Sequence, residues 1–320
     1  MATAAEAPTG STDGLRPSAP PRPNGRRQRM ETRRWLRELG WRHLLGIVVG
    51  VFALYPVVWV LSAAVNPESS ISSAQGLIPA NPTLNNFREL LAGQLSDGTR
   101  VPFLRWLWNS MLVSGTAALG TVFLCALAAY PFSRMRFKGR RTGLLTLLLV
   151  QMFPQLLAMI ALYLLMVSLS GIFPAVGLGT RTGLLFVYLG GALGLNAWLI
   201  KGFFDTLPKD LDESARVDGA THAQIFFRII LPLAAPVLAV IGLLAFIATI
   251  NDFLIASILL RDEQDFTLAV GLSRFIQDQY GQRWGPFAAG ALMGGLPVVA
   301  LFMYLQRYLV SGLTAGAVKG

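Results

Sequence analysis

Few residues in this chain have the types and the spacing that catalysis requires. The two histidines, His43 and His222, are far apart and lack metal-ligand spacing, and the single cysteine, Cys125, lies inside an apolar run. The sequence has no G-x-x-x-x-G-K-[ST] phosphate loop, no H-E-x-x-H zinc motif and no G-x-S-x-G motif following a strand. We therefore predict that the chain is not an enzyme and holds no metal or cofactor of its own.

One polar stretch between two long apolar runs carries side chains suited to charge pairing with another protein. Pro208 suits the first turn of a helix, so we predict a helix at about 209–217 with three acidic residues near the positive end of its dipole. An apolar face follows from residues at four-residue spacing: Leu207, Leu211 and Ala215.

A bend and a second helix are predicted to follow. Gly219 permits a sharp bend, and Thr221 with Gln224 forms a T-x-x-Q capping box that starts the second helix. Apolar residues line one side of this helix until Pro232, which we expect to end it. The two helices and the bend would form a rigid knob that suits docking into a cleft of another protein.

Asn251 and Asp252, in the apolar run AFIATINDFLIASILL, form a second candidate site. If a helix enters the membrane near Leu233, Asp252 lies about 28 Å along it, near the outer end of the hydrocarbon core. Two interpretations stay open: a residue of a transport pathway or gate, or a carboxylate that reaches the outer interface.

The composition indicates a membrane protein. Of the 320 residues 53% are hydrophobic and 14% are charged, against roughly 25% charged in soluble domains. The net charge of +10 comes from basic residues at the edges of apolar runs, whereas a nucleic-acid-binding protein would gather them in a patch.

Six apolar runs are long enough to cross a bilayer, which takes about 20 residues. We therefore predict an all-α integral membrane protein with six transmembrane helices, at about 44–65, 106–132, 143–168, 183–200, 234–258 and 286–305. Residues 1–30 are rich in Pro, Gly, Ala, Ser and Thr and are predicted to be a disordered basic arm; residues 31–320 form the membrane domain.

The distribution of Lys and Arg predicts the orientation. With both termini in the cytoplasm, 20 of the 27 Lys and Arg residues lie on the inner side, chiefly in RRQRMETRRWLRELGWR and RMRFKGRR. The polar stretch with the bend then faces the cytoplasm, and residues 261–285 face outwards.

The polar stretch resembles the EAA loop of permease subunits of bacterial ATP-binding-cassette (ABC) importers, whose pattern is E-A-A, two variable residues, then D-G-A. The chain has ESARVDGA at 213–220, with Ser214 where alanine is usual. The resemblance implies that this segment is a cytoplasmic coupling helix, with coupling residues Glu213, Ser214, Ala215, Asp218, Gly219 and Ala220.

Two further motifs support the resemblance. Asn251-Asp252-Phe253 is similar to the N-[DE]-F of sugar permeases, and QRYLVSGLTAGAVKG, at 306–320, is similar to the C-terminus of MalG-like permeases. Together they identify the chain as a member of the MalG-like carbohydrate family, over about residues 43–320.

The resemblance implies partners in a bacterial cytoplasmic membrane. They are a second, MalF-like permease, a MalK-like ATPase dimer that binds ATP and Mg, a solute-binding protein on the outer side, and an oligosaccharide. Glu213 would meet a basic group of the ATPase, and Tyr280 and Trp284 would meet the binding protein or form an aromatic belt. Gly312, Gly316 and Lys319 would lie in a flexible tail, too polar and glycine-rich to continue the sixth span, that reaches the ATPase.

The expected function is uptake of maltose or maltodextrin. Trehalose or another oligosaccharide is the alternative within the same class. An ion-coupled carrier would need buried ionisable groups, of which only Asp252 is available, and a membrane scaffold would not need an ATPase-docking knob.

Overall fold

The computed structural model describes residues 39–67, 79, 81–277 and 282–317. The predicted N-terminal arm, residues 1–30, lies outside this part of the chain. The chain divides into two compact units, residues 1–57 and 58–320, and the first described helix, α2, crosses their boundary.

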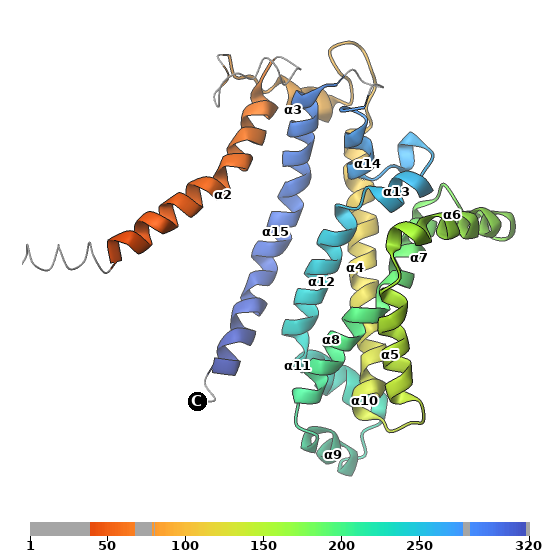
Figure 1. Cartoon of the computed structure of the whole chain (residues 1–320). Coiled ribbons are helices and arrows are strands. Elements are labelled where there is room, and N and C mark those ends of the chain that lie inside the picture. The colour runs from red at the N-terminus through yellow and green to blue at the C-terminus, as the bar shows by residue number, and fades with distance from the viewer. Residues whose placement is uncertain (1–38, 68–78, 80, 278–281, 318–320) are drawn as a thin grey trace, which may run out of the picture. The chain divides into compact units, whose positions relative to one another are not determined.

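The described residues form helices and no named strand (Figure 1). The only bridge between extended residues in this part of the chain joins Gln94 and Arg100. The elements are α2 (Trp41–Val65), α3 (Asn85–Ala92), α4 (Phe103–Arg134), α5 (Arg140–Gln151), α6 (Gln155–Ile172), η3 (Pro174–Val176), α7 (Arg181–Gly191), α8 (Leu193–Thr206), α9 (Asp210–Val217), α10 (His222–Ile225), η4 (Phe226–Ile230), α11 (Leu231–Leu233), α12 (Ala235–Ile250), α13 (Leu254–Leu259), η5 (Glu263–Asp265), α14 (Leu268–Ser273) and α15 (Trp284–Ala317).

Helix α4 is the centre of the larger unit. It packs against α7, α8, α12 and α14, and α15 packs against α12 and α3. The buried face of α4 is rich in alanine and serine, and these small side chains let neighbouring backbones come close. One apolar cluster surrounds the end of α4 that carries Trp106, and a second surrounds the end that carries Tyr130. This helix therefore reaches both ends of the packed region.

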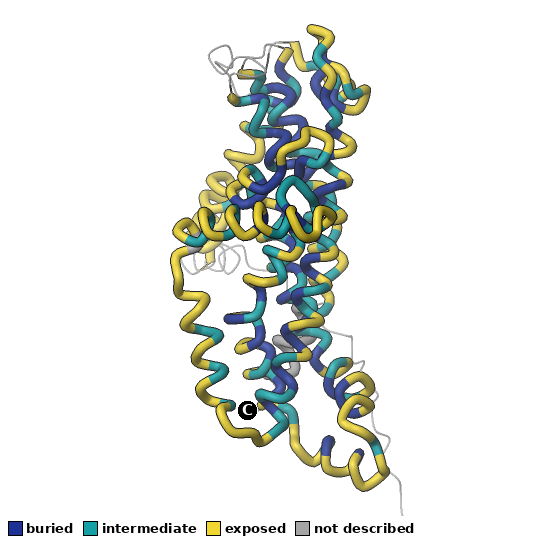
Figure 2. The backbone as a smooth tube through the Cα atoms, turned by 90° about the vertical axis from the view of Figure 1, so that its right-hand side faces the viewer, coloured by how far each residue is buried: buried dark blue, intermediate teal, exposed yellow. Residues whose placement is uncertain are grey.

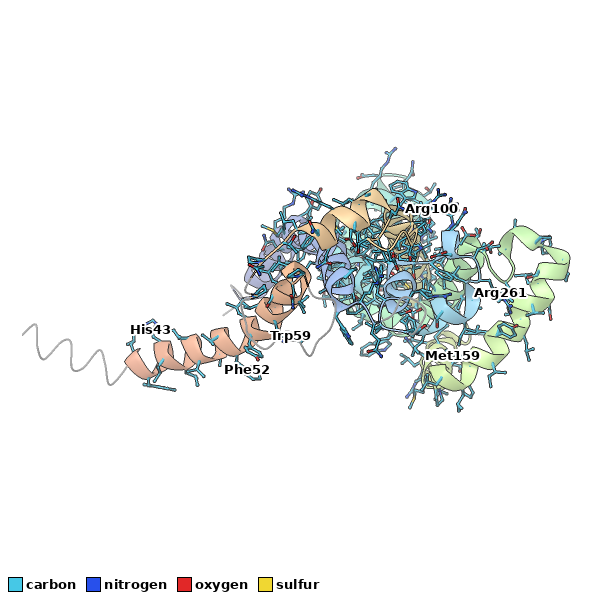
Figure 3. The ribbon with its side chains drawn as sticks, turned by 90° about the horizontal axis from the view of Figure 1, so that it is seen from above. His43, Phe52, Trp59, Arg100, Met159 and Arg261 are labelled. Carbon is cyan, nitrogen blue, oxygen red and sulfur yellow. The ribbon has the colours of Figure 1, made fainter. Side chains whose placement is uncertain are left out.

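Many large apolar side chains face outwards, as expected of helices that contact lipid or another membrane subunit. In α2 the side chain of Phe52 is 81% exposed, and in α6 that of Ile160 is 72% exposed. Figure 2 shows buried and exposed residues interspersed along the helices, and Figure 3 shows the side chain of Phe52 pointing away from its ribbon.

Three described helices are long and apolar enough to cross a membrane: α2, α4 and residues Trp284–Tyr308 of α15. Three bent helix pairs raise the number to six if each pair is one span, so the count of six stays a prediction. The predicted spans at 44–65 and 106–132 correspond to the unbroken helices α2 and α4.

The span predicted at 143–168 is divided between two helices, α5 and α6. The chain breaks between α5 and α6, and the two helices are bent by 96°. Pro154 lies in the break with extended backbone; it has no N–H to donate, and it disfavours helical backbone at the residue before it.

The spans predicted at 183–200 and 234–258 are broken as well. Helices α7 and α8 are bent by 51° beside Gly190 and Gly191, which are weak helix formers. Helix α12 ends at Ile250, and α13 begins at Leu254. In this second break the Asn251 amide donates to the carbonyl of Ile247, so a side chain competes with the helical backbone.

Candidate coupling loop

The polar stretch folds largely as its sequence predicts. Helix α9 spans Asp210–Val217 with acidic residues in its first turn, and Gly219 has a backbone φ of 80°. The capping box is present, since the hydroxyl of Thr221 accepts from the backbone N–H of Gln224 and the Gln224 side chain accepts from the N–H of Thr221. These contacts fix the bend between α9 and α10 locally.

The second helical segment ends at Leu233, one residue beyond the end predicted at Pro232. Residues Phe226–Ile230 form a π-helical turn, and α11 continues through Pro232 to Leu233. A π turn changes which carbonyl stands before the proline ring and so accommodates a residue that an α-helix would reject. The direction changes after Leu233, with a bend of 77° into α12.

The predicted coupling residues divide between two faces. Glu213, Ser214, Asp218 and Gly219 are exposed, and neighbouring Val217 is 88% exposed. In contrast, Ala215 is buried and Ala220 is half-buried. Glu213 and Val217 therefore lie on an outer face of α9 that is uncovered in the isolated chain.

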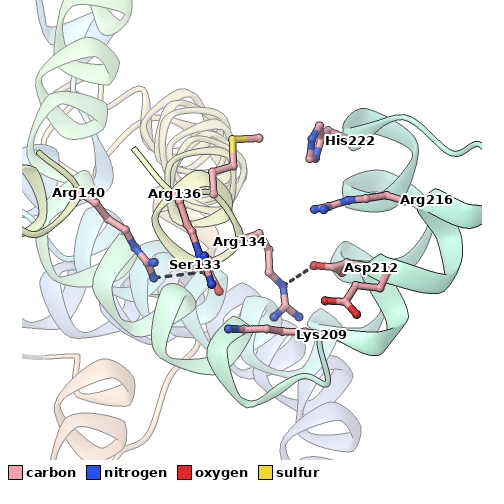
Figure 4. Close-up of a pocket in the computed structure, with 10 residues that line it drawn as sticks. Ser133, Arg134, Arg136, Arg140, Lys209, Asp212, Arg216 and His222 are labelled. Atoms are coloured by element: carbon pink, nitrogen blue, oxygen red, sulfur yellow. Dashed lines mark hydrogen bonds and ion pairs between the residues drawn. The ribbon is translucent and has the colours of Figure 1, made fainter. Parts of the chain in front are cut away.

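The inner face of the loop is held by the last turn of α4. Arg134 Nε lies 2.9 Å from Asp212 Oδ2, and these side chains are 1% and 5% exposed (Figure 4). The guanidinium of Arg134 also donates through Nη2 to the carbonyl of Leu207, at 3.2 Å. Ser133 donates to a carboxylate oxygen of Asp205 at 2.7 Å, and Lys201 pairs with the other oxygen of that carboxylate.

A cavity of about 420 Å³ lies between this turn of α4 and α9 (Figure 4). Its lining contains more basic than acidic side chains, and the acidic ones are Asp212 and Glu213. The basic ones, together with a histidine, are Arg134, Arg136, Arg140, Lys209, Arg216 and His222.

Asp252 lies in the break between α12 and α13, not within a continuous helix as expected. One of its carboxylate oxygens accepts from the hydroxyl of Tyr188 at 2.8 Å and from the N–H of Ala256 at 3.1 Å. A cavity of about 310 Å³ opens beside this pair and is also lined by Thr121 and Asn196. Asn251 is exposed, and its side-chain amide donates to the carbonyl of Ile247 in α12. The structure therefore brings Asp252, but not Asn251, to a cavity that other polar side chains also line.

Only part of the predicted outer contact site is described. Tyr280 lies outside the described residues, and the half-buried ring of Trp284 packs edge-on against Phe287, 5.8 Å away. Nearby, Arg283 pairs with Asp97 at 2.6 Å. The pKa of Asp97 is held below its ordinary value chiefly by the backbone N–H of Thr99.

The tail does not leave the helix where the sequence predicted. Helix α15 continues through Gly312 and Gly316 to Ala317, while Lys319 lies outside the described residues. An interior glycine costs a helix only about 1 kcal/mol relative to alanine, and no proline follows to stop it.

Three residues of these sites were not predicted from the sequence: Arg134, Ser133 and Tyr188. Arg134 was counted only as one of the basic residues that set the orientation, and Tyr188 lay in an apolar run without any charged neighbour. Each of these residues contacts its partner only through tertiary packing. The one signal in the sequence is the pair of carboxylates, Asp212 and Asp252, because a carboxylate that becomes buried requires a partner.

The sequence matches a family of membrane transport components and is similar to individual sugar permeases. Residues 98–315 match the family described as binding-protein-dependent transport system inner membrane component. The chain is 40% identical to the galactooligosaccharides transport system permease protein GanQ of Bacillus subtilis (strain 168), covering 91% of this chain and 99% of that protein. It is 42% identical to the maltose/maltodextrin transport system permease protein MalG of Escherichia coli (strain K12), covering 87% of this chain and 95% of that protein.

A solved structure has a similar fold. It is a chain of a bacterial ABC transporter involved in the import of the acidic polysaccharide alginate, matched with a TM-score of 0.70 and 24% identity. The match covers 86% of the present chain and 98% of the alginate transporter chain.

Proposed function

The chain belongs to the family of binding-protein-dependent transport system inner membrane components, and from this membership we propose that it imports maltose and maltodextrins. It is the permease subunit of an ABC sugar importer, and it is not an enzyme. Identity of 42% to a maltose/maltodextrin permease over 87% of the chain is the observation that carries the proposal.

The choice of sugar rests on the relatives and on the C-terminus. Relatives from several bacteria are named for maltose and maltodextrin, but one of equal similarity is named for galactooligosaccharides. All of these cargoes are short oligosaccharides rich in hydroxyl groups. The MalG-like end at 306–320 favours the maltose type, and galactooligosaccharides and trehalose are the alternatives.

The α9–α10 loop is proposed to couple transport to a separate MalK-like ATPase dimer, which binds ATP and Mg. The uncovered outer face of α9 supports this role, because Glu213 and Val217 offer a charge and an apolar contact side by side. The end of α15, with Gly312 and Gly316, is proposed to approach the same ATPase.

The remaining partners are a MalF-like second permease and an extracytoplasmic solute-binding protein. The exposed apolar surfaces of the long helices support a location within lipid and against another membrane subunit. With both termini in the cytoplasm, α9 faces the ATPase, and residues 261–285, including Trp284, face the binding protein.

Asp252 and Tyr188 are proposed to line the translocation path. Polar groups are costly within a membrane and are retained where they serve a pathway. A carboxylate, a phenol and the amide of Asn196 beside one cavity could exchange hydrogen bonds with sugar hydroxyls.

Co-purification and ligand identification test this function. The tagged chain should bring down an ATPase, a second permease and a solute-binding protein whose bound sugar is identified by mass spectrometry. Proteoliposomes containing the complex should take up labelled maltotriose with ATP inside. Uptake of galactotriose but not maltotriose would contradict the proposed cargo, and absence of any associated ATPase would contradict the importer.

A further inference from the structure

One turn of α4 holds the coupling loop at several points along its length. Arg134 binds the carbonyl of Leu207, where α8 ends, and the carboxylate of Asp212 in the first turn of α9. Beyond the bend, the ring of Tyr130 packs edge-on against Phe226, with centroids 5.2 Å apart. The loop therefore cannot move far without either carrying this turn or breaking buried contacts.

The Arg134–Asp212 pair is suited to transmitting movement. Both side chains are almost fully buried, so separating their charges within the protein is strongly unfavourable. The planar guanidinium donates to the carbonyl of Leu207 and pairs with the carboxylate of Asp212, so Arg134 joins the first turn of α9 to the end of α8. A lysine would keep the charge but not this fork of donors.

The opposite end of α4 is fixed just as firmly. Trp106 donates to the carbonyl of Glu263 at 2.7 Å, and the Asn109 amide donates to the carbonyls of Gln264 and Phe266 at 2.8 and 3.0 Å. A Cβ on Gly271 would lie 2.2 Å from the Trp106 ring, so this indole packs directly on the backbone of α14. One unbroken helix of 32 residues, about 48 Å long, thus joins the coupling loop to the 263–271 segment.

We propose that α4 transmits movement between the two ends of the permease, and that Arg134 is the positioning residue at its coupling end. The inference rests on the proposed function: displacement of α9 by the ATPase passes through the Arg134–Asp212 pair into α4. The same helix then moves residues 263–271, the segment proposed to face the binding protein. In the reverse direction, docking of the loaded binding protein moves residues 263–271, and α4 transmits this movement to α9 and so to the ATPase.

Variants of the ion pair test this proposal in the complete importer in proteoliposomes. Arg134→Lys keeps the positive charge and removes the hydrogen bond from the guanidinium to the carbonyl of Leu207. The double variant Arg134→Met with Asp212→Leu removes both charges together. A buried ion pair can be replaced by apolar residues with little loss of stability. We expect normal membrane abundance and normal ATPase association in both, with stimulation of ATP hydrolysis by loaded binding protein reduced by about tenfold.

The matched control is Arg136→Gln. Arg136 lines the same cavity but is exposed and takes part in no ion pair within the described residues, so stimulation should stay normal. Normal stimulation and normal uptake per ATP in Arg134→Lys would overturn the proposal. If the double apolar variant fails to assemble, Arg134→Lys alone decides the outcome.

A mutant cycle tests the connection between the two ends. Asn109→Ala weakens the outer attachment, and its combination with Arg134→Lys should reduce stimulation no further than the worse single variant, because both act through one helix. Independent, multiplicative losses would contradict transmission through α4. Loss of the associated ATPase in the unaltered protein would instead contradict the proposed function.

Discussion

Gly219 has a left-handed backbone (φ 80°) with open space around it, so a substitution there acts through backbone strain and not through a clash. A β-branched side chain is poorly accommodated at such a φ, whereas asparagine tolerates it. We expect Gly219→Val to lower sugar uptake by about tenfold, as strain of about 1–2 kcal/mol shifts the bend, and Gly219→Asn to retain it. Uptake is measured beside membrane abundance, and equal uptake in both variants would remove the bend from the mechanism.

The Tyr188–Asp252 contact joins α7 to the break that follows α12. Asp252→Asn removes the charge and keeps the shape, so we expect uptake to fall by about tenfold, the loss typical of a hydrogen bond to a charged group. Tyr188→Phe should lower uptake in the same direction. Ser257→Ala, which removes a hydroxyl that donates to the carbonyl of Leu254 in the same helix, serves as the control. Unchanged uptake in both site variants would contradict a role in the path.

The capping box is the device that starts the short helix α10. Thr221→Ala removes an N-cap, which costs about 1 kcal/mol, so amides at 223–226 should exchange hydrogen about fivefold faster with deuterium. Thr221→Ser should keep the cap. Thr206→Ala is a control at a helix end, because its hydroxyl donates back to Phe203 and caps nothing. Equal exchange in Thr221→Ala and the unaltered protein would show that tertiary contacts alone hold α10.

Helix α15 reaches Ala317, so the tail is presented as a continuation of a spanning helix. Removal of residues 313–320 should leave the importer assembled and lower its transport-coupled ATP hydrolysis, because the proposed contact with the ATPase is lost. Assembly is followed by co-purification and hydrolysis by phosphate release. Normal hydrolysis in the truncated importer would leave the tail without a role in coupling.

Short-range chemistry explains which elements could be predicted from sequence. The α9 helix, the bend at Gly219 and the Thr221–Gln224 box depend on residues a few positions apart, and all were predicted. The break at Asn251 was missed because the same polar side chains fit a helix that ends in the outer interface. The Arg134–Asp212 pair could not be foreseen, since nothing local relates α4 to α9.

The orientation of the whole chain in the membrane can be read with single cysteines. Cys125 is the only cysteine and is buried, so a Cys125→Ser background is a small change. In that background, and in cells that lack the ATPase, Glu213→Cys should react with an impermeant maleimide only in inverted vesicles, and Asp262→Cys only in intact cells. Both positions are exposed, and α9, which contains Glu213, lies at the opposite end of α4 from α13, which precedes Asp262 (Figure 1). Labelling with the sides exchanged would reverse the predicted topology.

The division of α9 into a held face and an uncovered face bears on how such a permease can change partners. Asp212 and Ala215 are constrained by the interior, so their side chains must change together with those of α4. Val217, at one of the two variable positions of the E-A-A pattern, is exposed and has no such constraint, so its side chain can differ with the surface of the ATPase. Exchange of exposed side chains on α9 can therefore adapt the contact to a different ATPase surface without disturbing the buried contacts that join α9 to α4.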